Sequence, residues 1–185
     1  MTKTLKELLT IESAIFANNI SQNVGLWIRQ TSNWMELYLV NIDTVESAII
    51  DDVVDVERTE EALIGGISAE LNDNLWHVTL VFAQKGFGPF LYQLAMELAT
   101  SAGSALAPDA SGHTSPAAHR VWDKFETNPN VEKQDFGDGK FGFASYSNDY
   151  EAINSRFCKS KISLKHIKQL EKIWENVVFR NASDW

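Results

Sequence analysis

The pattern of apolar and polar positions along the chain predicts a mixed fold, in which strands and helices alternate. Six short apolar runs are typical of strands. They lie at residues 25–28, 35–40, 53–57, 62–68, 76–82 and 104–106. The third and fourth runs predict consecutive antiparallel strands joined by a turn at residues 58–61. Gly65 and Gly66 within the fourth run indicate a bulge or a close backbone approach, and residues 72–74 predict a turn into the fifth.

Apolar residues spaced by three and four positions predict the helices. These lie at residues 4–18, 90–99, 115–127 and, at the end of the chain, about 163–180, while residues 44–52 form either a short acidic helix or a loop. Ser115 suits the cap of the third helix, and Gly103 the C-terminal cap of the second. Residues 131–136 and 140–147 predict a hairpin across residues 137–139. The pattern as a whole predicts a single α/β domain over residues 1–185, with its core at about 25–147.

Composition narrows the class of protein. With 185 residues, 44% hydrophobic and 22% charged, the chain has the profile of one soluble globular domain. A net charge of −9 argues against a general nucleic-acid surface, which requires clustered lysine and arginine. A single cysteine, Cys158, excludes an intrachain disulfide and a cysteine-based zinc cluster, and we expect no metal site. No apolar run approaches the ~20 residues that cross a bilayer, and no signal peptide is seen, so we expect a cytoplasmic protein without a membrane partner.

Residues 75–122 carry the pattern with the most functional content: strand, glycine loop, helix, short strand and helix. Gly86 and Gly88 let a ligand approach the loop backbone, and Lys85 adds a positive charge. Pro89 suits the first turn of the following helix, whose unpaired amides and dipole attract anions. The loop therefore predicts a pocket for a phosphate or pyrophosphate, the alternative being a plain strand-to-helix turn. Its spacing fits neither the P-loop nor the dinucleotide-binding fingerprint.

Three motifs stand in this stretch: a Gly-x-Gly-Pro-x-Leu-Tyr loop, a Leu-x-x-Asp strand end and a Ser-x-x-Ala-x-x-x-Trp helix. Their residues are Gly86, Gly88, Pro89, Leu91 and Tyr92, then Leu106 and Asp109, and then Ser115, Ala118 and Trp122. Together with the order of elements, these motifs resemble the GNAT superfamily of acyl-CoA-dependent N-acyltransferases, in particular a branch common in bacteriophage genomes. The resemblance covers about the central third of the chain, and the flanks follow it only in element order.

The resemblance implies a mixed, mostly antiparallel sheet flanked by helices, with acetyl-CoA as co-substrate. The pantetheine arm would lie along the strand that contains Leu80 and Phe82, and Ser115 would contact the same arm. The pyrophosphate would bind the loop amides. These belong to Gln84, Lys85, Gly86, Phe87 and Gly88. Two positions depart from the family pattern, because Ala83 stands where Arg or Gln is usual and Trp122 where a tyrosine often protonates the leaving thiolate.

Acyl transfer to an amine is helped by a base that removes a proton, directly or through water. Glu70, at the end of one strand, and His77, near the start of the next, are the candidates. Each has a plainer reading, Glu70 as a turn residue and His77 as a residue facing solvent or a core hydrogen bond. His113, Ser115 and Asp109 suggest a Ser-His-Asp arrangement, but Ser115 is better explained as a helix cap and no Gly-x-Ser-x-Gly elbow is present.

Two functions from different classes follow. The first is an acyl-CoA-dependent N-acyltransferase whose amine acceptor is a small molecule, a protein or a modified base. The second is a GNAT-fold protein without turnover that serves as a structural or interaction component, such as part of a phage particle. Residues 163–180 extend beyond the usual core, and their apolar stripe packs on the domain or else meets a partner or a second copy of the chain.

Overall fold

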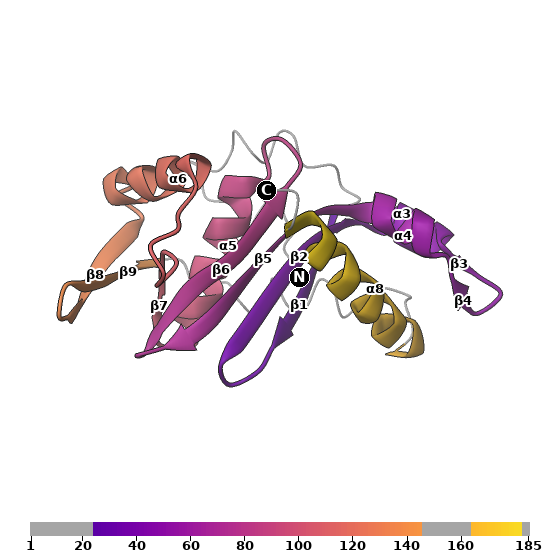
Figure 1. Ribbon diagram of the computed structural model, residues 1–185, viewed down its shortest axis with the longest axis horizontal. Coiled ribbons are helices and arrows are strands. Elements are labelled where there is room, and N and C mark those ends of the chain that lie inside the picture. The colour runs from indigo at the N-terminus through magenta and orange to yellow at the C-terminus, as the bar shows by residue number, and fades with distance from the viewer. Residues whose placement is uncertain (1–23, 146–163, 183–185) are drawn as a thin grey trace, which may run out of the picture.

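The computed structural model describes residues 24–145 and 164–182, and its centre is a seven-stranded sheet (Figure 1). The strands are β1 (Val24–Gln30), β2 (Trp34–Asn41), β5 (Leu63–Asn72), β6 (Leu75–Ala83), β7 (Ala105–Ala107), β8 (Val131–Gly137) and β9 (Lys140–Ser145). Their order across the sheet is β1-β2-β5-β6-β7-β9-β8. Neighbours are antiparallel except β6 and β7, which are parallel. The predicted mixed α/β class and mostly antiparallel sheet are confirmed.

Helices cover both faces of this sheet. The helix α5 (Gly88–Ser101) lies behind it in Figure 1, and α8 (Leu164–Ala182) crosses in front of it. The core on the α5 side is formed by apolar side chains of α5 with Met35 and Leu37 of β2 and Trp76 and Val78 of β6. The helix α6 (Pro116–Thr127) joins this core through Trp122. These contacts fix the position of α5, which follows the glycine loop, and of α6, which follows the short β7.

The helix α8 packs by its apolar stripe on the other face of the sheet. Leu170 and Trp174 are fully buried there. The Trp174 ring meets Trp27 edge to face at a centroid distance of 4.6 Å and lies 5.6 Å from the ring of Tyr38. The predicted C-terminal helix, packed on its own domain, is therefore confirmed at these residues. The helix predicted at residues 4–18 lies outside the described residues.

The segment between β2 and β5 differs from the prediction. It forms a lobe of α3 (Ile42–Ser47), a two-stranded sheet of β3 (Ile49–Ile50) and β4 (Val53–Val54), and α4 (Val56–Ala62). The predicted strand at residues 53–57 is confirmed only at Val53–Val54, which pair with β3 and not with β5, and the predicted turn at residues 58–61 is wrong. Asp55 caps a helix instead, because its carboxylate accepts the Arg58 N–H at 3.3 Å. Helix-favouring residues follow, and Thr59 and Ala62 are fully buried.

Other local predictions are confirmed. The turn between β5 and β6 places Asp73 and Asn74 at φ of 50° and 63°, the left-handed region that these residue types tolerate. Ser115 caps α6, and Gly103 ends α5 at a φ of 77°. Gly65 and Gly66 are sites of close approach between β5 and its neighbours. No helix among the described residues has the length and apolar character needed to cross a membrane.

Candidate functional site

The strands β6 and β7 diverge after His77, the third of the nine residues of β6, and we call this point the fork. They pair at Leu75–Ala105, Trp76–Leu106 and His77–Ala107, where β7 ends, while β6 continues to Ala83. Just beyond the fork the register between β5 and β6 steps, so that Thr79 has no cross-strand partner. The Thr79 hydroxyl donates to the Ser68 carbonyl at 3.2 Å across this irregularity. Such bulges bend a strand and often lie beside active sites.

The divergence leaves a cleft of about 680 Å³ beside the second half of β6. Its walls are β6, the loop before α5, the loop after β7 and α6. The lining residues taken from β6 are Val78, Thr79, Leu80, Val81, Phe82 and Ala83. A cavity of this size matches those that hold nucleotide-sized ligands. Among the described residues, the strand edge that faces it has no neighbouring strand beyond His77, which leaves backbone groups that could pair with an extended ligand.

Free backbone amides gather at the loop between β6 and α5. In this loop the Gln84 N–H donates to the Ile64 carbonyl and the Phe87 N–H to the Gln84 carbonyl. Within the described residues no hydrogen bond is formed by the remaining N–H groups. These belong to Lys85, Gly86, Gly88 and Phe90. No side chain caps α5, so its first turn presents donors and the positive end of its dipole to the cleft.

The loop glycines leave room for a ligand. Gly86 has a φ of 96°, which an L side chain rarely adopts. Gly88 lacks this constraint, and a Cβ added at either glycine meets no atom within 4 Å. The absence of a side chain at Gly88 is therefore not required by the packing of the described residues. It keeps the backbone open to the cleft.

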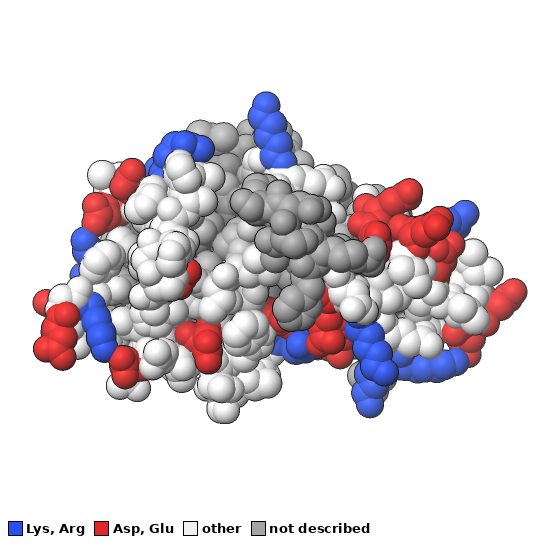
Figure 2. Space-filling model, in the orientation of Figure 1, with Lys and Arg blue, Asp and Glu red and all other residues white. Residues whose placement is uncertain are grey.

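The charge of the cleft differs from that of the whole chain. Although the net charge is −9, three of its lining residues are cations and one is a carboxylate. The cations are Lys85 from the loop and Arg120 and Lys124 from α6, and the carboxylate is Asp109. Figure 2 shows blue side chains over α6 and over the loop that follows β6. Free amides and cations on the same cavity favour an anionic ligand.

Most residues predicted to bind a cofactor line this cleft. They are Leu80, Phe82, Gln84, Lys85, Gly86, Gly88 and Ser115. Phe87 is the exception, because its ring packs against the core on the α5 side and its N–H is already bonded within the loop. Ser115 has two roles. Its hydroxyl accepts the Ala118 N–H at 3.2 Å, and the residue also lines the cleft.

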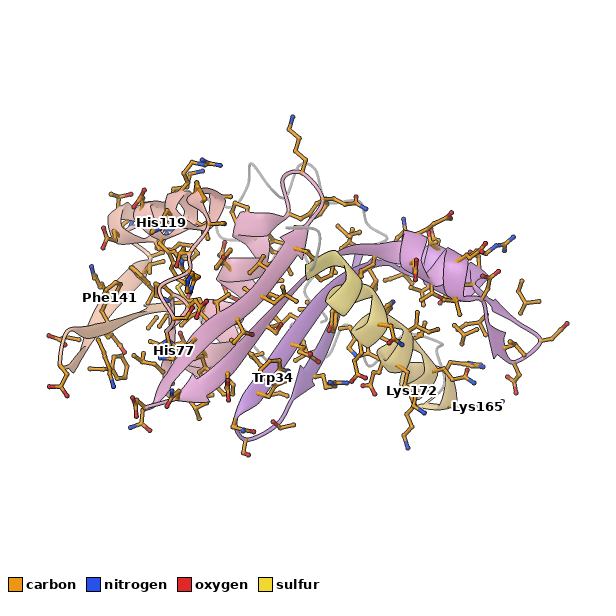
Figure 3. The ribbon with its side chains drawn as sticks, viewed as in Figure 1. Trp34, His77, His119, Phe141, Lys165 and Lys172 are labelled. Carbon is orange, nitrogen blue, oxygen red and sulfur yellow. The ribbon has the colours of Figure 1, made fainter. Side chains whose placement is uncertain are left out.

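The two candidate bases are neighbours at the fork. Glu70 and His77 are cross-strand partners in β5 and β6, on the sheet face that α8 partly covers. The His77 Nδ1 lies 2.9 Å from the Pro108 carbonyl oxygen, which can only accept, so Nδ1 carries the proton and Nε2 keeps its lone pair. Neither residue is part of the cleft lining, although Val78 next to His77 is. In Figure 3 His77 lies toward the lower end of β6, away from the loop.

Trp122, at the position where the superfamily that the sequence resembles often has a tyrosine, is buried and has the phenol of Tyr92 beside it. Trp122 stacks on Phe143 at 5.5 Å and meets Tyr92 edge to face at 5.1 Å. Tyr92 and Trp122 both line the cleft, and Tyr92 is the one phenol among its described lining residues. Burial raises the pKa of Tyr92 to about 12, so its hydroxyl stays protonated at neutral pH.

The loop after β7 does not form the Ser-His-Asp arrangement considered above. The Asp109 carboxylate accepts the Ser111 hydroxyl at 2.8 Å and the Ser111 N–H at 2.9 Å, an arrangement that shapes the turn. The His113 Nδ1 lies 3.0 Å from the same hydroxyl. Ser115, meanwhile, is engaged as the cap of α6. Within the described residues, no three histidine, cysteine, aspartate or glutamate side chains are grouped closely enough to hold a metal ion.

Sequence reasoning missed the contribution of α6. Arg120 and Lys124 were not singled out, although they stand four positions apart, a spacing that places two helical side chains on one face. Thr79 was also missed, because a register step cannot be read from an apolar run. Comparisons of the sequence with protein-family models, and of the protein with curated proteins and solved structures, found no match. The function has to be inferred from the geometry of the cleft.

Proposed function

We propose that the protein is an acyl-CoA-dependent N-acyltransferase that moves an acetyl group from acetyl-CoA to an amine. One observation carries the proposal: a cleft beside an unpaired strand edge, where free loop amides, two glycines and three cations meet. Acetyl-CoA suits these walls, because its pyrophosphate needs amide donors and cations and its pantetheine arm carries amides that can pair with a strand edge. The GNAT resemblance in residues 86–122 points to the same ligand.

In this proposal the catalytic base lies at the point where β6 and β7 diverge. The acceptor nitrogen attacks the thioester carbonyl, the C–S bond breaks, and the thiolate leaves as coenzyme A. His77 takes the amine proton on Nε2, directly or through a water, since Nδ1 is held by the Pro108 carbonyl. Glu70 beside it stabilises the imidazolium that forms. Tyr92 supplies the O–H that protonates the thiolate, because Trp122 at the usual position has none.

A second candidate is a binding protein without turnover. It is favoured by Trp122 at the position of the usual phenol and by the location of Glu70 and His77 outside the cleft lining. Both candidates bind acetyl-CoA, and only the first transfers its acetyl group to an amine. The location proposed is the cytoplasm, that of the host if the protein is phage-encoded, for the enzyme, and a phage particle for the protein without turnover.

Ligand-induced stabilisation tests the shared step. Acetyl-CoA at a hundred times its dissociation constant adds about 2.7 kcal/mol of stability, which raises the melting temperature of a domain of this size by about 5–10 °C. The matched variant is Gly88→Ala, whose Cβ meets no atom of the described residues and therefore leaves the free protein folded. We expect it to lose most of the shift, because the methyl group occupies the space of the phosphates. No shift for the wild-type protein contradicts the proposal.

Thiol release then separates the two candidates. Free thiol is followed with acetyl-CoA and a panel of polyamines, aminoglycosides, lysine peptides and aminated nucleotides. The enzyme releases thiol with at least one amine, and His77→Gln slows this by a factor of ~100 to 10,000. Acetyl-CoA binding without thiol release for any amine in the panel favours the binding protein.

A further inference from the structure

Between residues 24 and 145, the lysine and arginine side chains that pair with no described carboxylate all line the cleft. Between residues 24 and 145 there are seven lysine and arginine side chains, and four of them form ion pairs with carboxylates. These four are Arg29, Arg58, Lys133 and Lys140. The other three, Lys85, Arg120 and Lys124, pair with no carboxylate of the described residues and all line the cleft.

The three cations form two separate centres. Lys85 belongs to the loop with the free amides, so this centre holds one phosphate group or pyrophosphate. Arg120 and Lys124 stand four positions apart on α6, which is a different wall of the cleft. A pyrophosphate seated on the loop does not account for the second centre. A second anionic group on the same ligand does.

We propose that Arg120 and Lys124 form a phosphomonoester subsite, which selects ligands that carry a 3′-phosphate in addition to a pyrophosphate. This inference rests on the proposed function and deepens it, because it names the part of coenzyme A that the α6 wall recognises. A phosphomonoester bears close to two negative charges at neutral pH and offers three acceptor oxygens. Arginine binds such a group through two parallel N–H donors, and lysine adds a point charge. Nucleotides that have a pyrophosphate alone leave this wall unfilled.

The test compares two ligands that differ by this one group. Dissociation constants for acetyl-CoA and 3′-dephospho-acetyl-CoA are measured by calorimetry on the whole chain and on Arg120→Gln, Lys124→Gln and Lys133→Gln. Lys133 is the control, since it is an exposed cation that pairs with Glu126 and lies outside the cleft lining. Arg120 and Lys124 are exposed as well, so the substitutions leave the fold intact.

We expect the wild-type protein to bind acetyl-CoA roughly tenfold or more tightly than the dephospho form, the range of a charged hydrogen bond. Arg120→Gln should remove most of this preference and leave binding of the dephospho form unchanged, while Lys124→Gln has a smaller effect and Lys133→Gln none. Equal affinity of the wild-type protein for both ligands, or equal losses for both in Arg120→Gln, overturns the subsite while the proposed function stands. If the folded protein binds neither ligand, the proposed function fails and the subsite with it.

Discussion

Along its β5 edge, β6 is paired at eight positions, whereas along its β7 edge it is paired at three. The two edges also use glycine for opposite reasons. On the closed edge, a Cβ at Gly65 would lie 2.8 Å from the Phe82 carbonyl oxygen, and one at Gly66 would lie 2.7 Å from the Phe82 ring. In the loop that continues from the open edge into α5, a Cβ at Gly86 or Gly88 meets no atom of a described residue within 4 Å.

The glycines on the two sides of β6 therefore have different roles. At the closed edge, the missing side chain lets two strands approach and is needed for folding. At Gly88, which lies beyond the open edge, the packing of the described residues sets no such requirement, and under the proposed function the missing side chain leaves room for the ligand. The same residue type is therefore expected to give opposite results when substituted on the two sides of β6.

The largest expected effect concerns α8, which packs on one face of the sheet. Trp174 is fully buried against Trp27 and Tyr38, and its indole N–H donates no hydrogen bond to a described residue, so its contribution comes from packing. Trp174→Ala should lower the free energy of unfolding by about 3–5 kcal/mol in chemical denaturation. Lys172→Ala, an exposed position on the same helix, should change it by less than about 0.5 kcal/mol. Equal effects of the two variants would mean that α8 contributes no core.

The next effect compares the two edges of β6 directly. Gly65→Ala pushes a methyl group against backbone atoms of β6, Phe82 O at 2.8 Å and Ala83 Cα at 2.9 Å, and should cost about 1–3 kcal/mol of stability. Gly88→Ala should leave stability within about 0.5 kcal/mol of the wild type. The acetyl-CoA shift should show the reverse order, with Gly65→Ala keeping it and Gly88→Ala losing it. A Gly88→Ala protein that binds acetyl-CoA normally would remove the distinction between the edges.

The smallest effect concerns the turn that ends the closed edge. Lys140 donates to the Asp73 carboxylate, and this hydrogen bond and the charge of Lys140 lower the pKa of Asp73 below its ordinary value of 3.8. A carboxyl whose pKa falls on folding stabilises the protein above its unfolded pKa and loses this contribution as pH drops through the folded value. Asp73→Asn, which keeps the left-handed turn, should therefore lower the melting temperature slightly at neutral pH and not at all in strong acid.

Its control is the reciprocal substitution. Lys140→Gln should produce the same loss at neutral pH, and the double variant should lose no more than either single variant, because one ion pair is involved. Additive losses would show that the two side chains act independently.

Local signals in the sequence predicted most of the sheet and the glycine loop. The other five strand runs, the cap at Ser115 and the turn at residues 72–74 are each specified by residues next to one another, and each is confirmed. The failure at residues 53–61 has a local cause too. Val53 and Val54 suggested a strand, but the Asp55 cap and the acidic, helix-favouring residues after it outweigh β-branched propensity beyond this point.

The cleft itself could be predicted only in part. The loop could be predicted because two glycines and a proline directly after a strand are typical of a tight turn into a helix. The fork depends on how far β7 continues and on the register step at Thr79, and both are set by pairing between distant segments. Arg120 and Lys124 acquire their meaning only once α6 is placed across the cavity from the loop. Only the tertiary structure brings these two residues and Lys85 to the same cavity.

The lobe between β2 and β5 gives the molecule an electric dipole. Eight acidic residues and one basic residue lie between Ile42 and Ala62, so this segment carries seven of the nine net negative charges. Figure 1 places it at one end of the long axis and α6 at the other, and Figure 2 shows red side chains gathered over α3 and α4. Under the proposed function, the lobe would repel the polyanionic ligand and so favour its approach from the end that holds the cleft, an effect that weakens as salt is added. On an anion-exchange surface the protein would be held by the lobe, with the cleft facing the solvent.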